Sequence, residues 1–243
     1  MAEGFRIRRA SKKVTMKAIE PQPMVSTRAA AEIRTAILNG SLLPGSRVRQ
    51  EELAAKLGVS REPIRKALLV LEREGLVNNV LNRGAIVAPI DLPLINDIYE
   101  FRETVEAYVA GKVAALPDFD VGELQKIVAQ GRKAVRSGAL DKLIDADLAF
   151  HTALYEASGN KVVLEVMQTQ WGHIRRAMLT VLNSVGHRKQ VWDEHEALLD
   201  AIANRDVAKA KSLATAHIHG AESWLTAGLQ NSTTQRESQA DES

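Results

Sequence analysis

The stretch QEELAAKLGVSREPIRKALLVLEREGL, residues 50–76, decides the fold of the N-terminal part of the chain. Its apolar residues recur at helical spacing on both sides of Gly58, which predicts one helix before this glycine and a second that runs to Gly75. Ser60 is a good N-cap for the second helix, and Pro63 stands in its first turn, where a missing N–H costs least. A tight glycine-containing turn sets the second helix across the first, so that its N-terminus can enter the major groove of DNA.

Two flanking features complete a winged helix-turn-helix pattern. Upstream, apolar residues at helical spacing predict a helix that starts near Arg28 and ends at Asn39-Gly40. Downstream, residues 76–87 predict a short β-hairpin with Gly84 at its tip. We therefore expect a DNA-binding domain over residues 25–90.

The remainder of the chain favours a second, all-α domain. Beyond Pro89 and Pro93 no stretch shows convincing strand periodicity, and the helical patterns that follow have the lengths of an antiparallel bundle. These patterns cover about 93–115, 119–137, 140–157, 160–184, 188–203 and 207–229. The expected fold class is mostly α, with an N-terminal winged helix-turn-helix followed by an all-α antiparallel bundle over residues 91–229. We expect a disordered basic arm over residues 1–24 and a disordered tail over residues 230–243.

The composition excludes several classes of protein. Because the 243 residues include no cysteine, disulfides, thiolate metal sites and cysteine nucleophiles are excluded. No apolar run approaches the ~18 residues of a membrane span. Residues 1–19 contain basic side chains but no apolar signal-peptide segment. We therefore expect a cytoplasmic protein with no membrane partner.

The charge is unevenly distributed along the chain. Residues 1–90 carry a net charge of +8 and residues 91–243 a net charge of −6, within a total of +2. Such an asymmetry indicates nucleic acid or an anionic surface as a partner, and a chance distribution of solvated charge is the alternative.

Arginines on and around the second helix of the motif are candidate DNA contacts. Arg61 and Arg65 lie four residues apart and share a helical face, and arginine is the residue that bonds guanine O6 and N7 bidentately in the major groove. Arg49 and Arg83 are placed to meet phosphates or a minor groove. A small helical domain with solvated arginines is the alternative. The predicted DNA-binding residues are Arg49, Ser60, Arg61, Arg65, Arg83 and Gly84.

The stretch from Ile37 to Val87 resembles the N-terminal domain of GntR-family bacterial transcription regulators. The matching positions are Ile37-Leu38-Asn39-Gly40, Leu43-Pro44-Gly45, Glu52-Leu53-Ala54, Leu57-Gly58-Val59-Ser60-Arg61, Pro63, Arg65, Ala67-Leu68, Leu71, Glu74-Gly75-Leu76-Val77 and Arg83-Gly84. The resemblance implies that Arg61 and Arg65 contact bases and that the wing around Gly84 lies at the minor groove. Glu62 departs from the family's pattern, in which a small hydroxylated residue is common, and an acidic side chain near phosphate is unfavourable.

Four residues of the predicted bundle are candidate metal ligands. Asp147 and His151 lie four residues apart and share a helical face, and His195 and His217 lie on two later helices. Three imidazoles and one carboxylate suit a divalent transition metal. The residues alone leave open the alternative that these histidines bind no metal, because a helical histidine is more often a structural or surface residue. The chain has three more histidines, His173, His187 and His219.

Residues 92–227 resemble the C-terminal, FCD-type ligand-binding domain of the FadR subfamily. The resemblance rests on Asp147-Leu148-Ala149-Phe150-His151, Gly159-Asn160, Glu194-His195 with Leu198, Ala201 and Ile202, and Ala216-His217-Ile218. It implies that the bundle holds a divalent transition metal, with zinc or nickel preferred over manganese, on Asp147, His151, His195 and His217. Six predicted helices rather than seven are closer to the VanR-like branch.

A small effector carboxylate could complete the metal's coordination shell, and Arg102 could pair with that carboxylate. The alternative for Arg102 is an ion pair with Glu106, four residues further along the same helix. The expected function is a ligand-responsive regulator that binds a palindromic operator in double-stranded DNA as a homodimer and is switched by a small organic acid.

Two other classes of protein remain as alternatives. A metal-dependent hydrolase that uses metal-bound water would need an open metal position and a base, for which Glu194 or Glu196 could serve. Against it, the chain contains no HExxH-type motif, and such an enzyme has no use for the DNA-binding domain. The third class is a structural helical bundle with an incidental basic arm.

Overall fold

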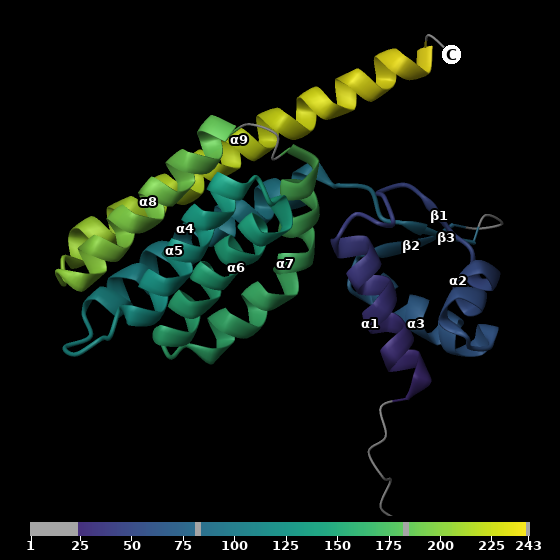
Figure 1. Ribbon diagram of the computed structural model, residues 1–243, viewed down its shortest axis with the longest axis horizontal. Helices are drawn as coiled ribbons and strands as arrows, with labels where there is room; N and C mark the ends of the chain where they lie inside the picture. Colours follow the sequence, from purple (N-terminus) through teal and green to yellow (C-terminus); the bar gives the residue numbers. More distant parts are fainter. Residues whose placement is uncertain (1–23, 81–83, 182–184, 242–243) are drawn as a thin grey trace, which may run out of the picture.

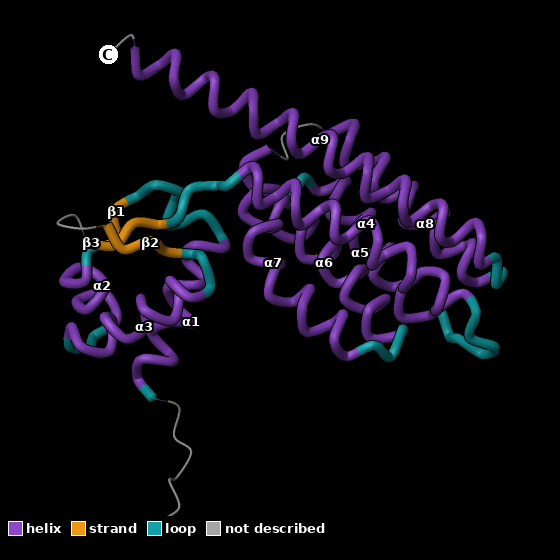
Figure 2. Tube along the Cα trace, turned by 180° about the vertical axis from the view of Figure 1, so that it is seen from behind, coloured by secondary structure: helices purple, strands orange, loops and turns teal. Residues whose placement is uncertain are grey.

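The computed structural model describes residues 24–80, 84–181 and 185–241, so that the predicted basic arm up to residue 23, and Arg83 of the wing, lie outside the described residues. Two domains stand side by side: a small one that contains a sheet, and a larger one built of helices (Figures 1 and 2). This arrangement confirms the expected fold class.

In the part of the N-terminal domain that the structure describes, there are three helices and three short strands. In chain order they are α1 (Val25–Leu38), β1 (Arg47–Val48), α2 (Gln50–Leu57), α3 (Arg61–Arg73), β2 (Val77–Val80) and β3 (Gly84–Val87). The strands are antiparallel in the order β1-β3-β2, with Arg47 opposite Ile86 and Asn79 opposite Ala85. The predicted helix-turn-helix is therefore present as α2 and α3, and the hairpin β2–β3 is its wing.

The turn between α2 and α3 forms because Gly58 adopts the left-handed conformation, with φ of +64°. Glycine adopts this conformation without a steric cost, which ends α2 and redirects the chain. Val59 N then donates to Ala54 O at 3.0 Å. On α3 the buried face of Ile64 and Leu68 packs into the core of the domain.

Two details of this domain differ from the prediction. β1 is a strand where the sequence indicates only a turn, because two residues are too few to show alternation. It is held beside the wing by Gly45 N, which donates to Val87 O, and by Val87 N, which donates to Ser46 O, both at 2.9 Å. α1 begins at Val25 rather than near Arg28.

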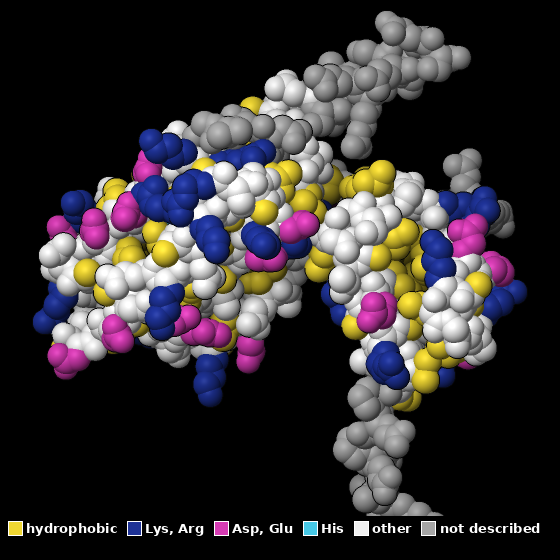
Figure 3. All heavy atoms as spheres, viewed as in Figure 1, with side chains coloured by type: hydrophobic (Ala, Val, Ile, Leu, Met, Phe, Trp, Pro, Cys, Tyr) yellow, Lys and Arg dark blue, Asp and Glu magenta, His cyan; other side chains and the backbone are white. Residues whose placement is uncertain are grey.

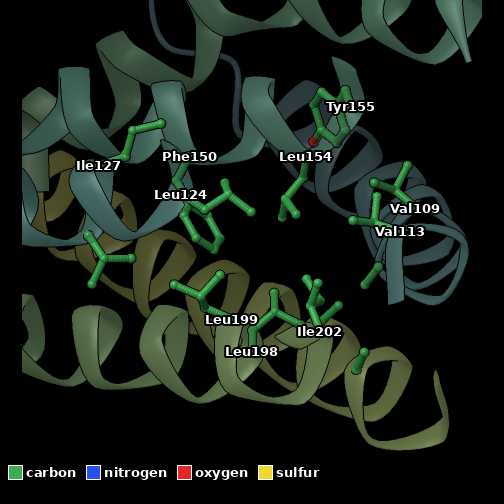
Figure 4. Close-up of a cluster of buried hydrophobic side chains, with 14 of the residues drawn as sticks. Val109, Val113, Leu124, Ile127, Phe150, Leu154, Tyr155, Leu198, Leu199 and Ile202 are labelled. Atoms are coloured by element: carbon green, nitrogen blue, oxygen red, sulfur yellow. The ribbon is translucent and has the colours of Figure 1, made fainter. Parts of the chain in front are cut away.

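Six helices form the C-terminal domain within the described residues, as the sequence predicts. They are α4 (Leu92–Ala114), α5 (Gly122–Ser137), α6 (Leu140–Ala157), α7 (Lys161–Val181), α8 (Val185–Ala203) and α9 (Val207–Asp241). Asp91 caps α4, since its Oδ1 accepts from Leu94 N at 3.3 Å. Figure 4 shows the core between α4, α5, α6 and α8, with Phe150 and Leu198 among its buried side chains.

The end of α9 corrects the expected disordered tail. The helix continues to Asp241, well past residue 230 where the tail was expected to begin, and it projects beyond the bundle in Figure 1. The segment contains no proline or glycine, and its glutamines, arginine and alanine have good helix propensity. A polar composition alone therefore did not mark the end of the helix.

Helix α7 is in contact with the small domain. Arg175 Nε donates to the backbone oxygen of Leu38 at 2.9 Å, and Arg176 donates to the backbone oxygen of Ala88. Beside these contacts, a cleft of about 970 Å³ lies between the domains and is lined from both, by Arg34 and His173 among others. Among the described residues, no helix combines the length and the apolar composition that a membrane span requires.

Candidate metal centre and DNA-reading surface

Three predicted ligands come together inside the bundle. His151 on α6, His195 on α8 and His217 on α9 are buried, and one ring nitrogen of each lies within 4.8 Å of those of the other two. Asp147, one turn before His151, has its Oδ1 3.7 Å from His195 Nε2. Three helices that are distant in sequence, α6, α8 and α9, thus bring four side chains to one point.

A buried carboxylate fixes the orientation of His151. Nδ1 of His151 lies 2.6 Å from Oε2 of Glu106, and the Tyr155 hydroxyl donates to Oε1 of Glu106 at 2.6 Å. Burial opposes the charge of Glu106, but the neighbouring His151 and Arg102 outweigh it and hold the pKa of this carboxyl well below its usual range. An ionised Glu106 accepts a hydrogen bond from the N–H at Nδ1 of His151, so Nε2 of this neutral ring carries a lone pair.

His217 is oriented in the same way by Glu194, whose Oε2 lies 2.8 Å from His217 Nδ1. Its other nitrogen, Nε2, faces Nε2 of His195 at 3.1 Å. Burial, together with His217, His151 and Arg102, holds the pKa of His195 well below its ordinary value, so this ring is neutral at neutral pH. Neutral imidazoles are the form that binds metals.

The unpartnered atoms of the centre fit a metal ion. Within the described residues, Nε2 of His151 and Nδ1 of His195 are buried and have no hydrogen-bond partner. A buried polar atom without a partner is costly, and a cation bound at Nε2 of His151 would remove that cost for this atom. The donor set of three imidazoles and one nearby carboxylate is the one that divalent transition metals take.

A small cavity of about 40 Å³ adjoins the histidines and is lined by Arg102, Arg188 and the ligand candidates His151 and His217. The structure pairs Arg102 with Glu106, at 2.8 Å between Nη2 and Oε1, which was the alternative interpretation of this residue. Arg188 was not singled out from the sequence. Its helix shows no pattern that would mark it as buried, and only the packing of α8 turns it into the cavity.

Of the other three histidines, His187 lines the small cavity beside the centre, whereas His173 and His219 lie elsewhere. His173 lies on α7 near the small domain, where an added Cβ on Gly75 would fall 3.1 Å from its ring. His187 stacks on Trp224, with 4.0 Å between the ring centroids. His219 has a side chain that is 70% exposed. Among the described residues, none of these three joins the buried cluster of ring nitrogens that His151, His195 and His217 form.

The predicted DNA-contacting arginines are exposed and carry acidic partners. Arg49 pairs with Glu52 at 3.0 Å and Arg61 with Glu51 at 2.9 Å, and Arg65 pairs with Glu62. Basic and acidic side chains accordingly lie side by side on the outer edge of the small domain, near α2, in Figure 3.

Two more predicted DNA contacts are exposed in the same domain, and a third lies outside the described residues. Ser60 is the N-cap residue of α3 and is exposed, and Gly84, with φ of +76°, is exposed at the start of β3. Arg83 lies outside the described residues.

Comparison with known families assigns both domains. Residues 25–87 match the family described as bacterial regulatory proteins, gntR family, and residues 97–220 match the FCD domain. An HTH-type transcriptional regulator from an unstable DNA locus of Streptomyces ambofaciens is 33% identical over 192 residues, which cover 77% of this chain and 79% of that relative.

Two further relatives extend the comparison. The gluconate operon transcriptional repressor of Bacillus licheniformis is 27% identical over 189 residues, covering 74% of this chain and 76% of that protein. The crystal structure of a GntR-type transcriptional regulator from Rhodococcus sp. RHA1 superposes with a TM-score of 0.74 at 25% identity, covering 82% of this chain and 96% of that one.

Proposed function

Because this chain belongs to the GntR family of bacterial regulatory proteins and carries an FCD domain, we propose that it is a homodimeric repressor whose operator affinity responds to a small organic acid bound beside a divalent metal. The family and the matched relatives are transcription regulators and not enzymes, which sets the hydrolase alternative aside. The name of the gluconate operon repressor supports repression as the mode of action. Such a protein acts in the cytoplasm, where the chromosome is.

The DNA-binding half of the proposal rests on α3. Arg61 and Arg65 stand in its first two turns, on the part of the helix that enters the major groove in winged helix-turn-helix proteins. In our proposal these two arginines read bases, Arg49 and Ser60 contact the backbone, and the wing with Arg83 and Gly84 lies at the minor groove.

The metal half of the proposal rests on the buried histidines. His151, His195 and His217 would hold zinc, nickel or manganese, with Asp147 as the fourth ligand, and the carboxylates of Glu106 and Glu194 keep two of the rings in the ligating tautomer. Once bound, a divalent ion supplies a fixed positive charge for an effector carboxylate.

The proposed effector needs more room than the cavity offers. A volume of about 40 Å³ holds roughly three water molecules, which is less than a carboxylic acid with a carbon chain occupies. Binding must therefore displace a lining side chain. Arg188 is the cation that we assign to the effector together with Arg102, whose guanidinium already meets Glu106.

Helix α7 provides a route from this cavity to the DNA-binding domain. Its Trp171 stacks on Tyr155 with 5.9 Å between ring centroids and lies 5.4 Å from the guanidinium carbon of Arg102. One turn later the same helix carries Arg175 and Arg176, which hold backbone oxygens of the small domain. A shift of α7, or of α4 directly after the Pro89–Pro93 junction, would change the spacing of the two DNA-binding domains in the dimer.

An apolar face on α4 and α7 supports the homodimer. Phe101 and Tyr108 lie seven residues apart on α4, Val162 and Val166 lie four apart on α7, and all four are at least 39% exposed. Tyr108 lies close to the start of α7, because the side chain of Asn160, just before this helix, lowers the pKa of the Tyr108 hydroxyl. Exposed apolar residues gathered in this way favour a protein partner over water. We assign this face to the second copy of the chain.

One observation carries the proposal: the chain combines a DNA-binding domain with a second domain in which three buried histidines converge. The test is selection of operator DNA from duplexes with a random segment of about 20 base pairs, the span of two half-sites one helical turn apart. We expect enrichment of an inverted repeat, and Arg65→Ala should bind it about 1–3 kcal/mol more weakly. The absence of any enriched sequence, or an Arg65→Ala protein with unchanged affinity, would contradict the assignment.

A further inference from the structure

Arg65 and Glu62 form a two-pronged ion pair on the helix proposed to read DNA. Nε and Nη2 of Arg65 donate to Oε2 and Oε1 of Glu62, both at 2.8 Å, and Lys66 Nζ lies 3.7 Å from the same carboxylate. Glu62 and Arg65 are both more than half exposed. Glu62 is the residue that departs from the family's usual pattern at this place, and the proposed function gives it no role.

The geometry of the pair leaves the base-reading edge of Arg65 open. A guanidinium carries five N–H groups in one plane. Glu62 takes the edge formed by Nε and Nη2. The outer edge, formed by the two Nη atoms, still presents two parallel N–H groups, which is the arrangement that bonds guanine O6 and N7.

The pair also restricts the motion of Arg65. A free arginine at the surface loses much side-chain entropy when it is immobilised on a base, and a side chain already held in place loses less. The same restraint disfavours the conformations in which the guanidinium would turn to a phosphate or to another base. An arginine side chain that an ion pair restrains should therefore discriminate between bases better than an unrestrained one.

The charge of Glu62 does not forbid a position near DNA. Glu62, Arg65 and Lys66 together carry a net charge of +1, so the group as a whole is attracted to the phosphates. By contrast, Glu51 makes a single contact with Arg61, through one Nη atom at 2.9 Å. The two-pronged restraint therefore acts on Arg65.

We propose that Glu62 is a specificity-determining residue, which holds Arg65 so that its outer edge faces a guanine in each half-site. This inference rests on the proposed base contact of Arg65. A purely structural alternative exists, because an acidic residue in the first turn of α3 also favours the helix dipole.

The test measures a ratio of affinities. Random-duplex selection with wild-type protein and with Arg65→Ala first identifies the guanine position whose preference depends on Arg65. The affinity for the selected duplex is then divided by the affinity for the same duplex with that guanine replaced by adenine. Because both affinities come from the same preparation, the ratio does not depend on how much of the protein is folded.

We expect Glu62→Gln to lower this ratio by about fivefold, which corresponds to the lower limit for one bidentate base contact. In an Arg65→Ala background, Glu62→Gln should leave the ratio unchanged. Glu32→Gln on α1 is the matched control, since it removes one exposed negative charge from the same domain without touching Arg65. Its ratio should equal that of wild type.

The outcomes separate the two claims. If Arg65→Ala retains every base preference, the proposed role of Arg65 fails, and the inference about Glu62 falls with it. If Arg65→Ala loses the guanine preference but Glu62→Gln keeps the wild-type ratio, the proposed function stands and Glu62 is not a specificity-determining residue. Tighter binding of both duplexes by Glu62→Gln with an unchanged ratio would assign Glu62 to charge repulsion alone.

Discussion

Nδ1 of His151 lies 2.6 Å from Oε2 of Glu106, across the packing of α6 against α4. The two residues are almost fully buried, with side chains 1% and 2% exposed. Because the carboxylate accepts a hydrogen bond from the N–H of one ring nitrogen, the other nitrogen keeps a lone pair that has no hydrogen-bond partner among the described residues. This pair therefore prepares His151 to bind a cation.

Replacing Glu106 should weaken metal binding. In Glu106→Gln the amide cannot serve both His151 and Arg102 as the carboxylate does, and we expect a 10–100-fold lower metal affinity, about the range for a lost partner of a ligating histidine. Competition with a chelator of known affinity measures it. Glu100→Gln, on the same helix and exposed, is the control and should bind metal as wild type does.

A second variant separates loss of the metal site from loss of the fold. Glu106→Gln leaves Arg102 as an uncompensated buried charge, which costs about 3–5 kcal/mol. Tyr155→Phe keeps that charge balance and removes only the hydroxyl that donates to Glu106. It should fold with a smaller drop in metal affinity. Wild-type affinity in both variants would show that Glu106 does not position His151.

Helices α5 and α8 approach each other so closely at Gly131 that a larger residue there would clash with α8. A Cβ at Gly131 would lie 2.1 Å from the ring of Trp192, whose side chain is 1% exposed and has no room to move. Gly131→Ala should lower the free energy of unfolding by about 1–3 kcal/mol through overpacking, measured by urea denaturation.

Gly220→Ala provides the comparison for this variant. Gly220 lies within α9 and has open space where its Cβ would be, so the alanine should stabilise the helix by up to about 1 kcal/mol. Equal effects of the two substitutions would contradict the packing described at Trp192.

The contact between α7 and the small domain should depend on Arg175. Its guanidinium joins Leu38 O to Asp145 on α6, at 2.9 and 2.5 Å. Arg175→Ala removes this link, so we expect faster protease cleavage in the connection between the domains. Arg132→Ala breaks ion pairs with Asp193 and Glu196 on the surface of the helical domain. The protease should cleave this variant at the wild-type rate. Equal cleavage rates for all three proteins would show that the domains are held by other contacts.

The basic arm should contribute affinity without specificity. Residues 1–20 hold six basic and two acidic side chains, and contacts between such side chains and phosphates release counterions whatever the base sequence. Deleting them should weaken binding about equally on selected and unrelated duplexes and flatten the dependence of log affinity on log salt concentration. A loss confined to the selected duplex would assign the arm to base reading.

Local sequence patterns predicted most helices and the hairpin. The features that depend on tertiary packing could not be predicted from them. The glycine at position 58 and the apolar stripe from Ile64 to Leu71 are local signals, so the helix-turn-helix could be predicted. β1 could not, because its two residues form a strand only through pairing with β3. The end of α9 was missed because polar residues without a helix breaker favour both a tail and a solvated helix.

In the candidate site too, local patterns predicted some residues, and tertiary packing was needed to find the others. Asp147 and His151 share a face at i and i+4, and the resemblance to a family assigned His195 and His217 to the same metal site. Glu106 lies 45 residues from His151, and nothing in either segment indicates their contact. Arg102 illustrates the limit, because both an effector carboxylate and Glu106 suit its sequence position, and the structure shows the ion pair with Glu106.

Elemental analysis of the purified protein tests the central claim most directly. We expect about one equivalent of zinc, nickel or manganese per chain, since His151, His195 and His217 form one ligand set. His195→Ala and His217→Ala should each lose that metal and melt at a lower temperature, because the metal binds only the folded state. His219→Ala, whose side chain is exposed, should retain both properties. A folded wild-type protein that holds no such ion even after metal is added would contradict the account.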